Sequence, residues 1–137
     1  MILIDTGPLV ALIDKADKDN HEKVTALFKL QETPPLTTWQ CLTEAMYFLL
    51  EKRGWEGQKT LLTFVTRGAI EVHDAKKEDV ERIIELMEKY YDRPMDFADA
   101  SLVFLAENRG LKQILTLDLS DFRIYRINGR DSFEIIE

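Results

Sequence analysis

The sequence has little of what a disulfide-linked or zinc-binding domain needs. Its 137 residues include one cysteine, Cys41, and two histidines, His21 and His73. A single cysteine excludes an intrachain disulfide, and these three side chains are too few for the usual four-ligand structural zinc site. A hydrophobic core must therefore stabilise the fold, and a chain of this length is long enough to build one.

Long apolar runs and an excess of positive charge are also missing. No segment approaches the ~18 apolar residues of a membrane-spanning helix. The start, Met1–Asp5, lacks basic residues ahead of its apolar run, which predicts a strand rather than a secretion signal, so we expect a cytoplasmic protein. Lys and Arg total 18 against 25 Asp and Glu, a net charge of −7. A chain of this sign binds nucleic acid only through a local basic patch or a bound cation.

The composition is that of a folded protein. Hydrophobic residues make up 45% of the chain and charged residues 31%, which excludes disorder as the main state. The length is close to the usual size of one domain, and we find no linker, repeat or low-complexity tract. We therefore expect residues 1–137 to form a single domain.

Segments of strand type alternate with segments of helical periodicity. Strands are favoured at 2–4, 36–38, 69–72, 113–117, 123–127 and 133–136. Apolar residues at helical spacing predict helices at 8–14, from about 20 to 32, and at 39–53, 55–66, 76–91 and 97–108. Gly54 separates the third helix from the fourth. This alternation predicts an α/β fold with a mainly parallel sheet.

Two acidic residues follow predicted strands directly. Asp5 comes after Ile2–Ile4, and Asp118 comes after Ile114–Leu117. The carboxyl ends of parallel strands form the functional edge of such a sheet. Either residue alone is as easily a helix cap or a turn residue, but two at the same edge favour a functional site.

A second pair of acids, Asp96 and Asp99, begins a predicted helix. Asp96 is in the position of an N-cap, which is sufficient reason for its presence. Asp99 shares its helix face with Val103 and Ala106. A carboxylate on an apolar face is costly unless it is paired or bound to a metal, so Asp99 is the stronger functional candidate.

Glu44 remains ambiguous from the pattern alone. On a helical wheel it faces away from Leu42 and Met46, as a solvated residue would. Tyr47 and Phe48 flank it, however, and a helix that is apolar almost all round can enclose an acid. Both interpretations stay open.

Four carboxylates in one place would repel one another and raise their pKa values. A divalent cation removes that repulsion, and all-oxygen ligands select Mg²⁺ or Mn²⁺ over zinc or copper. Such a site suits phosphodiester hydrolysis. It also reconciles a net negative chain with a nucleic-acid substrate.

Four segments together resemble the PIN-domain ribonucleases. They begin at the strand and turn of residues 2–9, continue with Thr43–Ala45 and Asp96–Ala100, and end with residues 116–122. They occur in the family's order and spacing over nearly the whole chain. In length and layout the chain is similar to the VapC-type toxins of that family, and residues 94–101 resemble a subgroup known only as predicted PIN nucleases.

The resemblance implies a fold, a metal and a set of site residues. It implies a parallel sheet of about five strands between helices, and RNA cleavage that depends on Mg²⁺ or Mn²⁺. The acids that it assigns to catalysis and metal binding are Asp5, Glu44, Asp99 and Asp118. The residues that it gives a secondary role are Thr6, Thr116, Asp96 and Asp121. It also implies a homodimer, formed here through helices 55–66 and 76–91, and an antitoxin protein as a further partner.

Basic and aromatic side chains elsewhere in the sequence are candidates for contact with RNA. Arginines near predicted loops or strand ends are candidates: Arg53, Arg93, Arg109, Arg123 and Arg126. Trp55 is a candidate for base stacking, whereas we expect Trp39 to pack in the core and Cys41 to be a small buried hydrophobe.

Two alternative functions remain. Residues 4–7 superficially resemble the motif of phosphatases that use an aspartyl nucleophile, but Gly7 stands where that family needs a second Asp. The other alternative is a PIN-like module that binds RNA or protein without catalysis.

Overall fold

The computed structural model describes all 137 residues and contains a five-stranded parallel sheet. Its strands follow the order β3-β2-β1-β4-β7. Their bounds are β1 (Leu3–Ile4), β2 (Leu36–Thr37), β3 (Glu71–Val72), β4 (Gln113–Leu115) and β7 (Glu134–Ile135). The predicted α/β class, with a mainly parallel sheet of about five strands, is confirmed.

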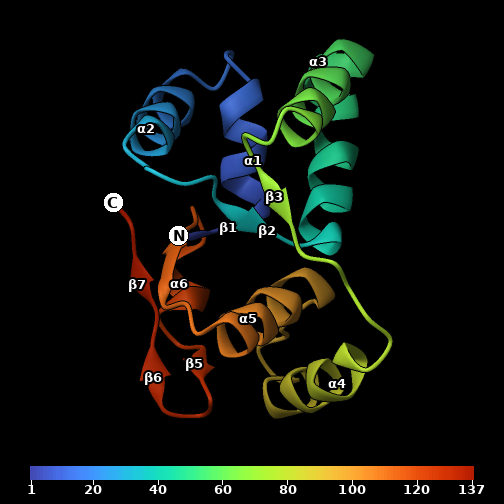
Figure 1. The fold of residues 1–137 in the computed structure, drawn as a ribbon, viewed down its shortest axis with the longest axis vertical. Helices are drawn as coiled ribbons and strands as arrows, with labels where there is room; N and C mark the ends of the chain where they lie inside the picture. The colour runs from blue at the N-terminus through green and yellow to red at the C-terminus, as the bar shows by residue number, and fades with distance from the viewer.

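Six helices surround the strands. They are α1 (Thr6–Ile13), α2 (Lys18–Lys29), α3 (Trp39–Thr66), α4 (Asp79–Lys89), α5 (Phe97–Arg109) and α6 (Leu119–Phe122). In Figure 1, α1, α2 and α3 lie in the upper half and α4 and α5 in the lower half, with β1 and β2 between them and β5 and β6 at the lower left. No helix is long and apolar enough to cross a membrane.

The predicted interruption at Gly54 is present inside α3. Gly54 has φ 66° and ψ −162°, which is far from helical. Glycine adopts this backbone without the steric penalty of a Cβ. The two predicted helices are therefore two segments of α3 that meet at a break.

The register of the central strands fixes where the candidate acids lie. β1 pairs with β2 and β4 on its two sides, with Leu3 opposite Leu36 and Ile114. The backbone N–H of Asp5 donates to the carbonyl of Leu115 at 3.0 Å. The residues that follow β1 and β4 therefore emerge together at the carboxyl edge of the sheet, as predicted for Asp5 and Asp118.

The strand predicted at 123–127 does not join the main sheet. It is reduced to β5 (Arg126–Ile127), which pairs antiparallel with β6 (Asp131–Ser132) in a separate hairpin. Asn128 and Gly129 both have positive φ angles, 54° and 68°, and reverse the chain at once. The following strand, β7, then takes the sheet edge.

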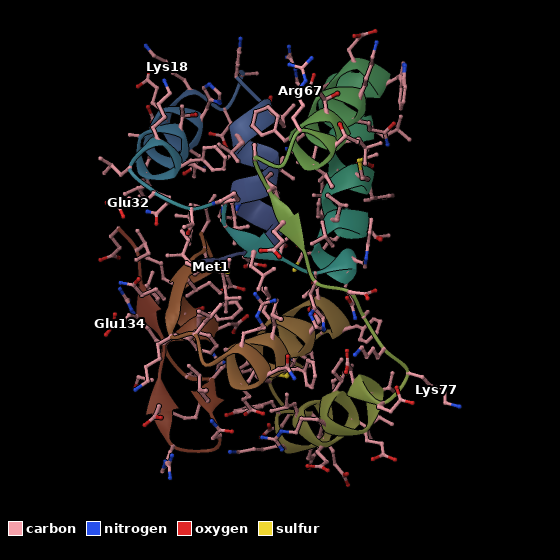
Figure 2. The ribbon with its side chains drawn as sticks, in the orientation of Figure 1. Met1, Lys18, Glu32, Arg67, Lys77 and Glu134 are labelled. Atoms are coloured by element: carbon pink, nitrogen blue, oxygen red, sulfur yellow. The ribbon has the colours of Figure 1, made fainter.

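The core is continuous, but several side chains expected in it are exposed. Thirty-two buried apolar residues form one cluster. Trp39 is 50% exposed because it opens α3 at the rim of the sheet, where no second layer covers it. Val80 and Ile84 are 41% and 58% exposed because α4 packs against α5 through a narrower face than its periodicity suggested. Charged side chains such as Lys77 point away from the body (Figure 2).

Candidate active site

The carboxyl edge of the sheet opens into an acidic cavity of about 600 Å³. All four acids assigned to catalysis line it, as do both secondary acids and Thr6. These residues are Asp5, Thr6, Glu44, Asp96, Asp99, Asp118 and Asp121. They come from α1, α3, α5 and α6 or the turns before them, so the fold collects in one place residues that span most of the chain.

Asp5 lies at the bottom of this acidic cavity. It is 6% exposed and caps α1, with Oδ1 accepting from the backbone N–H of Thr6 at 2.7 Å. Its Oδ2 accepts from the hydroxyl of Thr116 at 2.8 Å. Burial raises the pKa of Asp5 to about 6, although both hydrogen bonds oppose the rise. This hydrogen bond is a direct contact through which Thr116 could play the supporting role predicted for it.

Asp96 and Asp99 make different contacts at the start of α5. Asp96 is the N-cap of α5, because its Oδ1 accepts from the backbone N–H of Asp99 at 2.7 Å. The side chain of Asp99 is partly buried, and its Oδ2 accepts from the hydroxyl of Tyr125 at 2.9 Å. Burial first, and then the charges of Asp96 and Asp5, raise the pKa of Asp99 to about 8.

Asp118 and Asp121 complete the opposite wall. The Thr116 hydroxyl accepts a hydrogen bond from the backbone N–H of Asp118 at 3.0 Å and donates one to the side chain of Asp5. This one threonine therefore links the residues that follow β1 and β4. Burial and the neighbouring Asp121 raise the pKa of Asp118. Asp121 forms an ion pair with Arg93 at 3.0 Å. Oxygen atoms of Asp99, Asp118 and Asp121 lie within 4.8 Å of one another.

Glu44 faces the acidic cavity from α3, partly buried. The helix brings it there together with Phe48, four residues later and therefore on the same face. Its side chain therefore lines the cavity wall and does not stand on a fully solvated face.

The donor set fits a hard divalent cation. Every candidate ligand is a carboxylate oxygen, and three of these carboxyls, on Asp5, Asp99 and Asp118, have raised pKa values, chiefly because burial disfavours their charged form. A bound cation would favour that charged form. The nearest soft donor is the thiol of Cys41, 4.0 Å from Asp5. Burial raises its pKa to about 12, so the thiol stays protonated. As predicted, Cys41 is a buried small residue, and oxygen ligands favour Mg²⁺ or Mn²⁺.

A family model described as the PIN domain matches residues 2–128. The chain belongs to the PIN-domain family. This PIN domain is 27% identical over 135 residues to Ribonuclease VapC26 of Mycobacterium tuberculosis, covering 98% of this chain and 99% of that protein. The resemblance found in the sequence is confirmed.

The solved structures that share the fold of this PIN domain include two that cover most or all of the chain. One is VapC20 of Mycobacterium tuberculosis, described as a sarcin-ricin loop cleaving toxin, with a TM-score of 0.77 and 18% identity over 88% of this chain and 94% of the other. The second is VapBC2 from Rickettsia felis bound to a fragment of its promoter DNA, with a TM-score of 0.70 and 18% identity over 100% of both chains.

Three residues at the PIN-domain site were missed by sequence reasoning. Tyr125 contacts Asp99 from just before the β5–β6 hairpin, and no local pattern marks it. Asp17 and Lys52 also line the acidic cavity. The sequence pattern could have indicated Lys52, because it follows Glu44 and Phe48 at a constant spacing of four residues on one helix face.

The five candidate arginines have other partners in this PIN domain or lie outside the acidic cavity. Arg93 pairs with Asp121, and Arg123 with Glu137. Arg126 donates to three backbone carbonyls. Arg109 contacts Met1, and Arg53 packs on Gly57. Arg93 is thus beside the acidic cavity, which Asp121 lines, and the positions of the other four arginines give their predicted contact with RNA no support.

Proposed function

We propose that this PIN domain is a metal-dependent endoribonuclease that uses Mg²⁺ or Mn²⁺. The observation that carries the proposal is the convergence of Asp5, Glu44, Asp99 and Asp118 on one cavity. Two of these carboxyls, those of Asp5 and Asp99, have pKa values raised to about 6 and about 8. A cluster of this kind is stabilised by a divalent cation and suits phosphodiester hydrolysis.

The four acids would hold the cation, and their neighbours would hold the acids. When bound, the cation polarises a phosphoryl oxygen and lowers the pKa of water. The Thr116 hydroxyl fixes one oxygen of Asp5, and the Tyr125 hydroxyl fixes one oxygen of Asp99. Asp96 caps α5 by accepting a hydrogen bond from the backbone N–H of Asp99, which fixes the first turn of the helix that carries Asp99. Partners of this kind orient metal ligands, and their loss typically lowers metal affinity about 10- to 100-fold.

The biological role that we propose is that of a toxin controlled by an antitoxin. VapC20 bears the description of a toxin that cleaves the sarcin-ricin loop, and VapBC2 that of a complex on promoter DNA. Ribonuclease VapC26 is similar along nearly the whole chain. An RNA target makes the cytoplasm the expected location.

We also propose that the protein is a homodimer. Large apolar side chains are exposed on α3 and the start of α5, where they border a groove of about 730 Å³ next to the acidic cavity. These side chains are Trp39, Tyr47, Phe48 and Phe97. An apolar patch of this kind marks an interaction surface. Trp55, at the start of one of the helices named from the sequence, is exposed as well. Light scattering should give about twice the chain mass of 15.9 kDa.

The test of the proposed function is RNA cleavage by the purified protein with Mn²⁺ and with EDTA. We expect internal cuts in RNA with Mn²⁺ and none with EDTA. The Asp118→Asn variant serves as the control for contaminating nucleases. Binding of RNA without cleavage under both conditions would favour the non-catalytic module, and release of phosphate from a phosphomonoester would favour the aspartyl phosphatase.

A further inference from the structure

Lys52 is the only cationic residue among those that line the acidic cavity. The other charged residues of the lining are seven acids: Asp5, Asp17, Glu44, Asp96, Asp99, Asp118 and Asp121. None of the ion pairs in the structure includes Lys52. Its side chain is exposed, so the three N–H donors of its ammonium are available to a ligand.

The position of Lys52 on α3 relates it to the acids. Glu44, Phe48 and Lys52 succeed one another at intervals of four residues, and all three line the cavity. Lys52 is thus about 12 Å from Glu44 along the helix axis. This separation suits a phosphate farther along the strand than the one that the four acids would hold.

We infer that Lys52 binds an RNA phosphate next to the scissile one and so positions the substrate strand. The inference rests on the proposed nuclease function. A strand entering this cavity meets repulsion from every charged side chain of the lining except Lys52. An ammonium contributes to phosphate binding as a point charge, independently of base identity.

Lys52 has a structural alternative that the test must separate. It lies two residues before Gly54, in the last turn of the first segment of α3, where a cation stabilises the helix dipole. Lys29 occupies the matching place in the last turn of α2 but does not line the acidic cavity. Lys29→Met is therefore the matched control for Lys52→Met.

The experiment measures Mn²⁺-dependent cleavage of short single-stranded RNAs of different sequence over a series of KCl concentrations. We expect Lys52→Met to raise KM about tenfold for every RNA, with kcat within about twofold. The slope of log(kcat/KM) against log[KCl] should become shallower by about 0.7, the value for one phosphate contact on a single strand. Lys52→Arg should stay near wild type, and Lys29→Met should change neither KM nor the slope.

Two results would overturn the inference. One is a Lys52→Met protein with the KM and salt slope of Lys29→Met. The other is a fall in kcat at constant KM, which would assign Lys52 to the chemical step or to the metal.

A binding measurement separates this inference from the proposed function. Anisotropy of a labelled RNA is measured on Asp99→Asn protein, with and without Lys52→Met. A tenfold loss of affinity supports the inference even if the wild-type protein cleaves no RNA, in which case the nuclease proposal alone fails. Equal affinities overturn the inference even if the wild-type protein cleaves RNA.

Discussion

The inner and outer carboxylates of the acidic cavity differ in what compensates their charge. The inner pair, Asp5 and Asp99, accept hydrogen bonds from uncharged groups only, and both have raised pKa values. The outer pair have structural partners: Asp96 caps α5 and Asp121 pairs with Arg93. The charged forms of the inner pair are therefore disfavoured in the metal-free protein, and a bound cation would stabilise them.

The largest effect is expected from Asp99→Asn. The change keeps the shape of the side chain and removes one charge from the inner pair. If the cation contributes several kcal/mol to the transition state, cleavage with Mn²⁺ should fall by about a thousandfold. Single-turnover cleavage of a labelled RNA measures the loss.

The melting temperature of metal-free Asp99→Asn provides the control. Removal of a repelling carboxylate should leave it unchanged or higher, because burial and the neighbouring acids oppose the charge of Asp99. Unchanged cleavage in this folded variant would refute the assignment of Asp99 to the site.

A smaller effect is expected from Thr116→Val. The substitution removes the hydroxyl that donates to Asp5 and accepts from Asp118, so Mn²⁺ affinity should fall about 10- to 100-fold. The matched control is Thr37→Val, since Thr37 is equally buried in the sheet but donates to the carbonyl of Ile4. Calorimetric titration with Mn²⁺ should distinguish the two, and equal affinities would show that Thr116 has only a structural role.

A pH effect on the metal-free protein follows from the inner pair. The pKa values of Asp5 and Asp99 rise from 3.8 to about 6 and about 8 on folding. Between pH ~4 and ~8 the folded state therefore holds protons that the unfolded state has lost, so stability falls as pH rises through this window. Thermal melting in EDTA should show a decline of several degrees. Asp99→Asn should flatten the curve between pH ~6 and ~8, and a wild-type-like slope in that variant would argue against the raised pKa of Asp99.

The smallest effect is expected from Asp96→Asn on the outer side. Asn caps a helix about as well as Asp, so the start of α5 should be preserved and cleavage should fall by less than about tenfold. Asp96→Ala removes the cap and should cost about 1 kcal/mol of stability. If Asp96→Asn abolished cleavage as Asp99→Asn does, the distinction between inner and outer acids would be wrong.

Much of this comparison could be predicted from the sequence. Strand ends and helix caps are local features, so the places of Asp5, Asp96 and Asp118 followed from the residues around them. The apolar face around Asp99 marked it as the acid whose burial needs a reason. The break at Gly54 could also be predicted from local sequence, because the helical periodicity of apolar residues ends at this glycine.

What escaped prediction depends on tertiary packing. Trp39 looked like a core residue because periodicity does not reveal which layer covers a helix end, and the structure leaves it half exposed. Tyr125 reaches Asp99 only because residues 123–127 leave the main sheet and lead into the β5–β6 hairpin. The place of Glu44 required the packing of α3, since a helical wheel alone could not tell a solvated face from a cavity wall.

The central claim is that the inner pair of carboxylates needs a divalent cation. The most direct test is the melting temperature at pH ~8 in EDTA and then in excess Mn²⁺, for the wild type and for Asp99→Asn. At a concentration 100 times the Kd, binding stabilises the folded state by about 2.7 kcal/mol, which predicts a rise of several degrees for the wild type and a clearly smaller rise for the variant. No rise in the wild type at millimolar Mn²⁺, or equal rises in both proteins, would contradict the account.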